Sequence, residues 1–388
     1  MKILFMADVP PDKDSGAAGT EYQTIKAIRA LGHEVDTVWA DALPHRISHG
    51  NLHYLVELPF AYRRHAIKGL GKEHYDVIHV NQPHGYLAAK AVRRLSESTV
   101  FIHRSHGFEL RVQNELAPWL KLYNHDNRSH LKKLLSHSLG RLLSHNYHSI
   151  ARYADGHIVS CTQCRDFLIQ KLKVPVEHIA VIPQAPLRAF TKEPVAPMTK
   201  ERLKRILYVS QFAFFKAPMI LAGAFNQLSQ LDDRLRFTWV CSNEHQSEIK
   251  SLLNDKTRAR VTLLDWMDQE RLMQVFDGHG VFLFPSFFEG FGKAFLEAMS
   301  RGLCVIAADN GGARDVIDHG CNGLLVPTGC VESLVRSCME LVGDLRRATR
   351  ISRDAAVCAQ AYSWERVASE TLAFYESRVE SKARRRAL

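Results

Sequence analysis

The chain has 388 residues, 46% hydrophobic and 24% charged, and its 51 Lys and Arg against 41 Asp and Glu give a net charge of +10. This balance predicts two or three folded domains, favours anionic partners, and excludes an intrinsically disordered or collagen-like chain. No apolar run approaches the ~20 residues of a membrane span, and the sequence does not open on a basic and then apolar leader, so we expect a cytoplasmic protein. The irregular spacing of the Cys residues predicts reduced thiols and no disulfide framework.

Short runs of β-branched and aromatic residues alternate with longer segments of helical period in the first half of the chain. Tyr22, Ile25, Ile28 and Leu31 are spaced as on one face of a helix, which Gly32 is expected to end. Strands are predicted at residues 2–7, 33–40, 75–80, 99–103, 155–160 and 179–182. The connections are long enough to hold helices, so the pattern predicts a parallel sheet covered on both faces.

The alternation of strand and helix patterns is interrupted at residues 186–204, where Pro and Lys among small and polar residues predict a linker. Beyond it, strands are predicted at 206–210, 237–241, 261–265, 281–285, 305–308 and 324–326. We therefore expect two doubly wound α/β domains, residues 1–186 joined by a carboxy-terminal helix over 370–388, and residues 187–369. Ligands bind beyond the carboxyl ends of parallel strands, so two such halves facing each other would hold a ligand in a cleft.

The most informative stretch is Pro285–Met299, where a strand ends, a glycine-containing loop follows, and a helix is expected to begin near Lys293. The unpaired N–H groups and dipole of a helix start hold phosphate oxygens, and Gly292 lets the backbone approach a ligand closely. Glu289 lies in the loop and Glu297 about one turn into the helix, where carboxylates suit the hydroxyls of a sugar and a ribose. The spacing favours a nucleotide-diphosphate sugar site over the alternative of two solvated surface acids.

Through Glu289–Gly292 and Leu296–Met299, the chain resembles the GT-B-fold retaining glycosyltransferases of family 4 (glycosyl transferases group 1), whose signature is two Glu with seven residues between them. Other segments fall in the family's order: Asp76–Val80, His106-Gly107, Gly311-Gly312, Gly323–Pro327 and Ser363-Trp364. The resemblance implies two Rossmann-like domains, the first receiving the acceptor and the second the donor. It implies hexosyl transfer with retention of anomeric configuration, and no metal or tightly held organic cofactor.

The resemblance also implies roles for individual residues. Lys216 would neutralise the donor diphosphate, while Glu289 and His106 would hold and polarise the sugar. Donor-binding roles are implied for Gly16, Gln211, Phe291, Gly292, Lys293 and Glu297.

The chain departs from the family pattern at three of these places. Gln211 stands where the family usually has Arg, so the phosphate clamp would depend more on Lys216 and the helix start, or on a cation such as Arg104 or Lys293. Ser15 replaces the first of two glycines, and Gln184-Ala185 replaces a common Asn-Gly, to which we assign no role.

Two short motifs are set aside. Asp12-Lys13-Asp14 looks like a metal-binding Asp-x-Asp, but it lies in a Pro-rich loop of a two-domain chain and is expected to be a solvated acidic loop. Cys161 and Cys164 have C-x-x-C spacing without a second pair, so neither zinc binding nor redox chemistry is expected.

A basic amphipathic helix is predicted between Lys121 and Arg152, with a candidate membrane-binding segment at 129–148. Its Leu side chains would enter an anionic bilayer surface, or pack on the first sheet while its cations face water, and both interpretations stay open. The basic residues of 382–386 would add attraction, although a frayed tail is the commoner explanation.

These features predict transfer of a sugar from a nucleotide-diphosphate donor to an acceptor hydroxyl, with a lipid-linked or polysaccharide precursor as acceptor. Such an enzyme would act in the cytoplasm or peripherally on the inner face of the membrane. The alternatives are a nucleotide-sugar epimerase of the same fold and a catalytically silent nucleotide-sugar-binding module. Nucleic-acid binding is not expected, because the basic residues lack interleaved aromatic side chains. UDP, GDP and ADP all remain open as the carrier.

Overall fold

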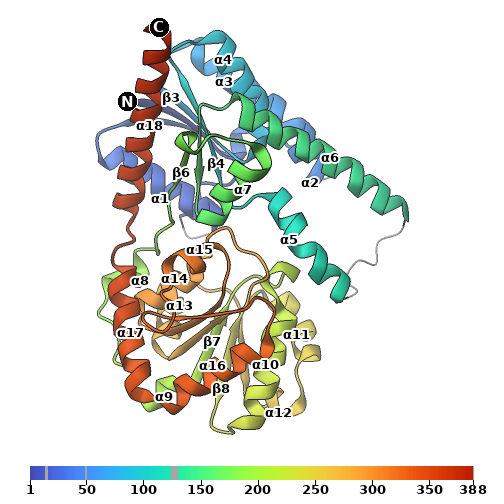
Figure 1. Ribbon diagram of the computed structural model, residues 1–388, viewed down its shortest axis with the longest axis vertical. Helices are drawn as coiled ribbons and strands as arrows, with labels where there is room; N and C mark the ends of the chain where they lie inside the picture. The colour runs from blue at the N-terminus through green and yellow to red at the C-terminus, as the bar shows by residue number, and fades with distance from the viewer. Residues whose placement is uncertain (14–15, 49, 124–129, 388) are drawn as a thin grey trace. The chain divides into compact units, whose positions relative to one another are not determined.

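The computed structural model describes residues 1–13, 16–48, 50–123 and 130–387, which form two compact units (Figure 1). The first unit comprises Met1–Gln184 and Trp364–Leu388, and the second comprises Ala185–Ser363. Each unit is built on one six-stranded parallel sheet with flanking helices, which confirms the predicted α/β class.

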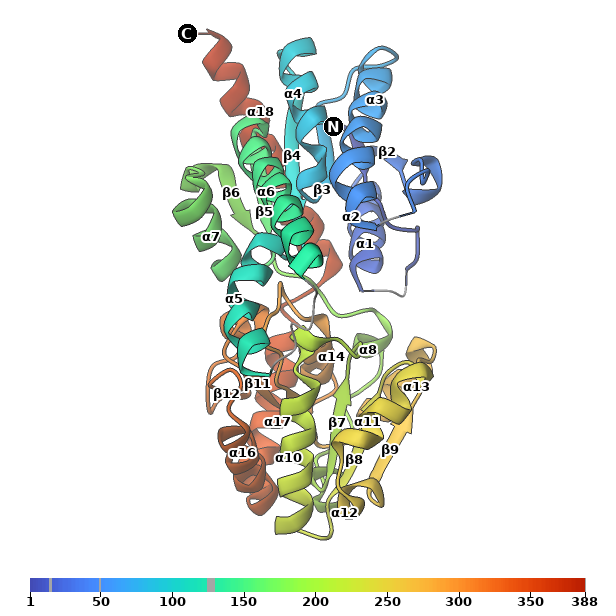
Figure 2. The same cartoon turned by 90° about the vertical axis from the view of Figure 1, so that its right-hand side faces the viewer.

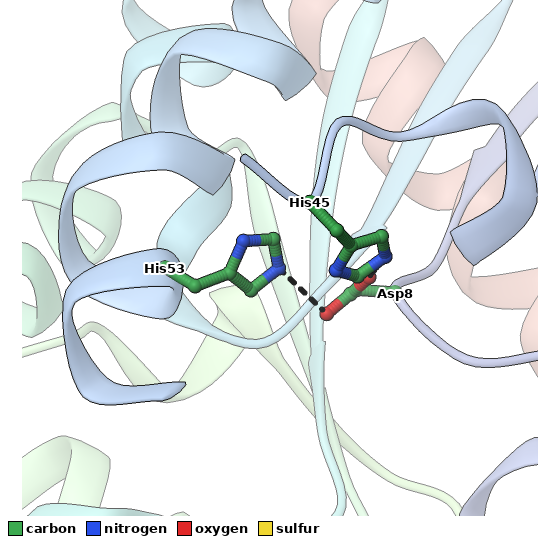
Figure 3. A group of neighbouring side chains, drawn as sticks. All are labelled: Asp8, His45 and His53. Atoms are coloured by element: carbon green, nitrogen blue, oxygen red, sulfur yellow. Dashed lines mark ion pairs between the residues drawn. The ribbon is translucent and has the colours of Figure 1, made fainter. Parts of the chain in front are cut away.

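The first sheet has the strand order β2-β1-β3-β4-β5-β6. Its strands are β1 Lys2–Met6, β2 Glu34–Val38, β3 Val77–Asn81, β4 Val100–Ser105, β5 Gly156–Val159 and β6 Ile179–Val181. Every residue of β3, β4 and β5 is buried, as expected for strands that helices cover on both faces. Just beyond β1, Asp8 lies beside His45 and His53 (Figure 3).

Helices cover the two faces of this sheet. They are α1 Ala17–Ala30, α2 Gly50–Leu52, α3 Leu58–Leu70, α4 Tyr86–Leu95, α5 Glu109–Leu122, α6 His130–Tyr153, α7 Thr162–Leu172 and α18 Trp364–Ala387. The unit also has the 3-10 helices η1 Ala40–Ala42, η3 Pro83–Gly85 and η4 Val176–His178 and the π-helix η2 His53–Glu57. Figures 1 and 2 show α1 and α18 together on one face and α3, α4 and α6 on the other. Gly32 follows α1 at φ +85, the left-handed conformation of a helix stop, so this predicted helix end is confirmed.

The second sheet has the order β12-β11-β10-β7-β8-β9. Its strands are β7 Arg205–Val209, β8 Arg236–Val240, β9 Val261–Leu264, β10 Val281–Phe284, β11 Cys304–Ala308 and β12 Leu324–Val326. Its helical elements are α8 Ala189–Lys192, α9 Lys200–Leu203, η5 Phe214–Lys216, α10 Pro218–Leu231, η6 Asn243–His245, α11 Gln246–Leu252, α12 Asp255–Arg258, α13 Gln269–Asp277, α14 Lys293–Ser300, α15 Gly311–Val316, α16 Val331–Gly343 and α17 Leu345–Ala359. All of the predicted strands in both sheets are present, with ends within two residues of the predicted ones.

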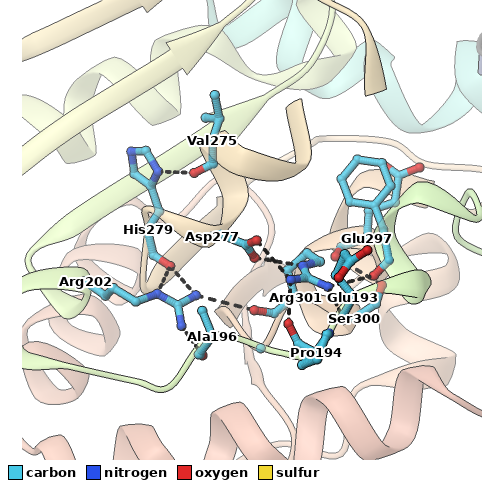
Figure 4. A network of polar contacts seen from close by, with 12 residues as sticks. Glu193, Pro194, Ala196, Arg202, Val275, Asp277, His279, Glu297, Ser300 and Arg301 are labelled. Atoms are coloured by element: carbon cyan, nitrogen blue, oxygen red, sulfur yellow. Dashed lines mark hydrogen bonds and ion pairs between the residues drawn. The ribbon is translucent and has the colours of Figure 1, made fainter. Parts of the chain in front are cut away.

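The linker predicted at 186–204 is wrong as a description of this segment, which contains α8 and α9 and packs into the second unit. Leu187 and Phe190 are buried in that unit's core. Arg301, 1% exposed, donates to the carbonyl groups of Glu193 and Pro194 at 2.7 and 2.9 Å (Figure 4). The local composition of residues 186–204 could not show this packing, because Arg301, whose guanidinium group binds the backbone carbonyls of the segment, is about a hundred residues away in the sequence.

The basic end of α18 is also ordered, so the expected frayed tail is wrong. Lys382 donates to the Thr99 carbonyl and to Asp155, and Arg386 lies 3.2 Å from Glu97. Within the described part of the chain, no helix combines the length and apolar character needed to cross a bilayer.

Several histidines are buried within the two units. Burial away from water lowers the pKa of His79 and of His157 to about 3 and that of His279 to about 4. His79 on β3 is hydrogen-bonded to the Tyr375 hydroxyl of α18. The carboxy-terminal helix is therefore joined to the centre of the first sheet by a polar contact as well as by its apolar face.

Candidate active site

The centre of the second sheet is the point where its strand order reverses. β7 has β8 and β9 on one side and β10, β11 and β12 on the other. The loops that follow the two strands on either side of this point run in opposite directions. In doubly wound folds, ligands bind in the space between such loops, at the carboxyl ends of the strands. Lys216 lies in the loop after β7 and Pro285–Gly292 in the loop after β10. The predicted signature therefore occupies a position where this architecture accommodates ligands.

Lys216 and Glu289 form an ion pair between these two loops, with 2.7 Å between Lys216 Nζ and Glu289 Oε1. Their side chains are only 16% and 6% exposed, so water screens the pair weakly. The ammonium group also lies 5.1 Å from the centroid of the Phe215 ring. An ammonium has three N–H donors, so one carboxylate partner leaves capacity for a second anion.

Main-chain hydrogen bonds hold the two loops together. The N–H groups of Phe287 and Phe288 both donate to the carbonyl oxygen of Phe215, at 2.9 and 3.3 Å. The Tyr208 hydroxyl on β7 donates to the carbonyl oxygen of Lys216 at 3.1 Å. The backbone thus fixes the separation of the ammonium and its carboxylate partner, without relying on long side chains alone.

Glycines let a third loop approach this pair. Gly292 precedes α14 at φ +91, and Gly311 begins α15 at φ +58, both in the left-handed region. A Cβ on Gly311 would lie 2.5 Å from the Cβ of Glu289 and 2.8 Å from its carbonyl oxygen. The Gly312 N–H donates to the Phe291 carbonyl at 3.1 Å. A side chain at Gly311 would therefore displace Glu289, and one at Gly312 would displace Phe291.

The second signature acid lies on α14. Glu297 is 8% exposed, and burial raises its pKa, although Lys293 and a hydrogen bond from the Leu187 main chain oppose this effect. Lys293, the first residue of α14, is half-buried. Phe291 is 2% exposed and packs against Phe295. Both signature acids are therefore enclosed by the second unit instead of being solvated surface residues.

Gln211, which replaces the family's Arg, is exposed in the loop after β7. Its amide brings no charge to the site. The cationic groups of the two loops are therefore Lys216, which is paired, and Lys293 at the helix start.

His106 belongs to the first unit, in the loop after β4. It is hydrogen-bonded through Nε2 to the carboxylate of Glu21, and the Gln184 amide lies 3.2 Å from its Nδ1. Glu21 is fully buried on α1; burial acts to raise its pKa, but His106 and Arg104 outweigh it and lower the pKa to about 2. Both ring nitrogens of His106 have protein partners, so a sugar hydroxyl would reach either one by displacing a partner.

Two other residues named from the sequence lie nearby in the first unit. Gly16 is exposed immediately before α1, and a Cβ there would meet no atom within 4 Å, so this backbone does not require glycine. Ser15 is outside the described residues. Arg104 at the end of β4 is fully buried, with Nη1 3.4 Å from the Thr24 hydroxyl and with Nε and Nη2 lacking a hydrogen-bond partner. Its charge helps to keep Glu21 ionised.

The motifs that were set aside have ordinary surroundings. Asp12 is exposed, and Asp14 is outside the described residues. Cys161 and Cys164 are buried free thiols, and Arg111 donates to Cys164 Sγ at 3.2 Å. The Cys161 thiol and the Arg111 charge lower the pKa of Cys164, whereas the Cys161 pKa is raised by the same contact between the thiols and by burial.

The leucine stripe of α6 is partly used by the core. Leu143 is 8% exposed within the first unit's core, and Leu139 and Leu142 pack against it. The carboxy-terminal half of the leucine stripe therefore packs on the core of the first unit, which is one of the two interpretations left open by the sequence. The side chains of residues 130–137, including the other leucines of the predicted stripe, lie outside the described part of the structure, as do residues 124–129 entirely.

Sequence reasoning missed the surroundings of His106. The burial of Glu21 could have been predicted, because Glu21 precedes Ile25 by four residues and Ile28 by seven and so lies on the buried face of α1. The sequence gives no indication of the contact between Gln184 and His106, because the two residues are 78 positions apart. Gly311 had been noted only as part of a motif, and its closeness to Glu289 required the fold.

Comparison with known proteins identifies the family of this chain. The family model described as Glycosyltransferase Family 4 matches residues 15–185, and the model described as Glycosyl transferases group 1 matches residues 203–344. D-inositol 3-phosphate glycosyltransferase from Nocardia farcinica is 34% identical over 118 residues, 30% of this chain and 26% of the relative. The chain spans 26% and 43% of the length of the first two curated relatives that it matches.

Solved structures share the fold along nearly the whole chain. Sucrose-phosphate synthase from Thermosynechococcus elongatus superposes with a TM-score of 0.74 at 20% identity, covering 97% of this chain and 98% of that one. Anabaena Alr3699/HepE in complex with UDP-glucose gives a TM-score of 0.66 at 17% identity, covering 96% and 100%. From the two family matches and the shared fold, we conclude that this chain belongs to the group 1, family 4 glycosyltransferases of GT-B fold.

Proposed function

We propose that this protein transfers a hexosyl group from a nucleotide-diphosphate sugar to an acceptor hydroxyl with retention of anomeric configuration. The observation that carries the proposal is the weakly solvated Lys216–Glu289 ion pair at the carboxyl ends of β7 and β10, next to the start of α14. This arrangement combines a cation, helix N–H groups and a sugar-binding acid within one unit.

In the proposed reaction, the donor diphosphate lies over the start of α14. Lys216 keeps its hydrogen bond to Glu289. Its remaining N–H groups donate to the leaving phosphate, where negative charge grows in the transition state. Glu289 contacts the sugar, and Glu297 accepts hydrogen bonds from the ribose hydroxyls. The leaving phosphate takes the acceptor proton, so no protein nucleophile is needed, and the transfer requires no metal.

His106 acts from the acceptor-side unit in this proposal. Its contact with Glu21 keeps the imidazole oriented, and the Gln184 amide is the exchangeable partner that a sugar hydroxyl replaces. A neutral amide is displaced more readily than a charged partner, because hydrogen bonds to charged groups are the stronger ones.

UDP-sugars are the first donors to test, since Anabaena Alr3699/HepE was solved with UDP-glucose. A panel of UDP-, GDP- and ADP-hexoses is incubated with sugar and lipid-linked acceptors, and nucleotide release and the anomeric configuration of the product are measured. Acceptor-dependent nucleotide release with retention supports the proposal. Inversion of the anomeric centre contradicts it, as does an isomerised donor without acceptor or binding without any turnover.

The proposed role of Lys216 has its own test. Lys216→Ala is expected to lower turnover by roughly 10²- to 10³-fold, the scale of losing one transition-state partner. Lys250→Ala is the matched control, because Lys250 is an exposed lysine of the same unit on α11. Normal turnover in Lys216→Ala would refute the assignment.

We further propose that the protein binds an anionic membrane surface through the amino-terminal part of the 129–148 segment, where it would meet a lipid-linked acceptor. The support is the basic amphipathic sequence, in which Lys132 and Lys133 stand beside Leu131, Leu134 and Leu135. Deleting the whole segment would also remove Leu143 from the core. The sharper experiment is charge reversal of Lys132 and Lys133, which should weaken sedimentation with anionic vesicles; equal sedimentation of both proteins contradicts the idea.

A further inference from the structure

Three side chains with metal-ligating atoms meet at the carboxyl end of β1 in the first unit. Asp8 follows β1, His45 lies in the loop after η1, and His53 begins η2. The distance from Asp8 Oδ1 to His45 Nε2 is 3.6 Å and that from Asp8 Oδ2 to His53 Nε2 is 3.5 Å. The three ligating atoms all lie within 4.8 Å of one another, and Figure 3 shows the two rings facing the carboxylate.

The hydrogen bonds around His53 fix which nitrogen has the free lone pair. His53 Nδ1 is 2.8 Å from Glu57 Oε2, and a carboxylate only accepts, so the proton is on Nδ1. His53 Nε2 is then an acceptor, buried with no hydrogen-bond partner in a side chain that is 5% exposed. Asp8 Oδ1 is likewise buried without a partner. A metal ion between these acceptors would satisfy them, as would a second proton on His53.

The spacing matches a first-row divalent ion. Ligands about 2.0–2.1 Å from a tetrahedral zinc ion are roughly 3.3 Å from one another, close to the two distances observed. Two imidazoles and one carboxylate are ordinary zinc ligands, and a solvent molecule completes the tetrahedron. His45 is 53% exposed in its side chain, which leaves a path for the ion from solvent.

A second layer of contacts supports both histidines. Glu57 holds the His53 ring in the orientation that carboxylates impose on zinc-binding imidazoles. The same carboxylate accepts hydrogen bonds from the main-chain N–H groups of Arg46 and Ile47, next to His45, at 3.1 and 3.2 Å. The His45 and His53 rings stack with 4.4 Å between their centroids. Glu57 thus holds the ring of His53 and the backbone that follows His45.

We propose that Asp8, His45 and His53 bind one divalent transition-metal ion, with Zn²⁺ the best match. The ion joins the loop after β1 to the 45–53 segment and so stabilises the first unit. This role is structural and separate from the sugar transfer proposed above, which still requires no metal.

The experiment titrates metal-stripped full-length protein with Zn²⁺ by calorimetry and with Co²⁺ by visible absorption, which reports tetrahedral geometry. The variants are Asp8→Asn and His45→Ala; the latter removes an exposed side chain and should leave the fold intact. The matched control is His74→Ala, since the 62%-exposed His74 side chain pairs with Asp76 at 3.5 Å and has no third ligand among the described residues. Melting temperature with and without Zn²⁺ is a second measurement.

We expect one tightly bound equivalent in the unmodified protein and in His74→Ala, with a tetrahedral cobalt spectrum. Asp8→Asn and His45→Ala should bind at least 10-fold more weakly, and Zn²⁺ should no longer raise their melting temperature. Unchanged affinity in these variants would place the metal elsewhere and overturn the proposal. Absence of binding to the unmodified protein would also overturn it, leaving a proton in place of the ion.

Discussion

Replacing Lys216 by Met tests the ion pair at the heart of the candidate site. At an effective dielectric constant of ~20, unit charges 2.7 Å apart attract by about 6 kcal/mol, part of which offsets their dehydration. Lys216→Met leaves the 6%-exposed Glu289 carboxylate without this partner, so the free energy of unfolding should fall by about 3–5 kcal/mol. Glu289→Gln should also be destabilising, because it leaves a weakly hydrated ammonium.

The double variant removes both charges and should be much less destabilised than the sum of the two single changes. We expect a coupling free energy of at least about 2 kcal/mol, measured by urea denaturation of the four proteins in a double-mutant cycle. The control cycle uses Arg347 and Glu340, a pair in the same unit whose side chains are 31% and 49% exposed, for which about 0–1 kcal/mol is expected. Additive losses at Lys216 and Glu289, or equal coupling in the two cycles, would refute the reasoning.

Three further outcomes are expected. Gly311→Ala should destabilise the protein by about 1–3 kcal/mol more than Gly320→Ala in thermal unfolding, because both glycines have positive φ but only Gly311 lacks space for a Cβ; equal losses would contradict this. Glu297→Ala should weaken nucleotide-sugar binding about 10- to 100-fold in calorimetry while turnover at saturation changes little, and a loss confined to turnover would disprove the ribose contact. Since the three buried histidines described above have folded pKa values below the unfolded value of ~6.5, their contribution to stability is complete above that pH and is lost as the pH falls toward 4, by about 1.4 kcal/mol per pH unit each. Burial also lowers the pKa of His84 to about 4 and lowers that of His103, which adds to the loss, whereas it raises the pKa of Glu109 to about 7 and raises that of Glu297, which opposes the loss. The histidines that lose stability outnumber the two opposing carboxyl groups, so the free energy of unfolding should be lower at pH 5 than at pH 6, and equal stability at the two values would count against buried neutral imidazoles.

The positions of the strands along the chain and their parallel arrangement could be predicted from the sequence because the signals are local. A strand such as Val281–Phe284 is an apolar run ended by Pro285, and the alternation of such runs with helical segments indicates parallel sheets. The signature loop was also visible, because Glu289, Gly292 and Glu297 are close together in the chain. Local composition was misleading at 186–204, where an arginine about a hundred residues away binds the backbone carbonyls.

The sequence by itself determined the strands, the carboxyl ends of those strands as the candidate ligand position, and the resemblance to the glycosyltransferase family through the Glu289–Met299 motif and the segments that follow the family's order. Only the tertiary structure decided that Lys216 pairs with Glu289, that Glu21 and Gln184 occupy both nitrogens of His106, and that Asp8 meets two histidines. These contacts join residues from different strands and helices. Hydrophobic periodicity specifies which face of an element is buried, but the partner of a polar group depends on how elements distant in sequence are brought together.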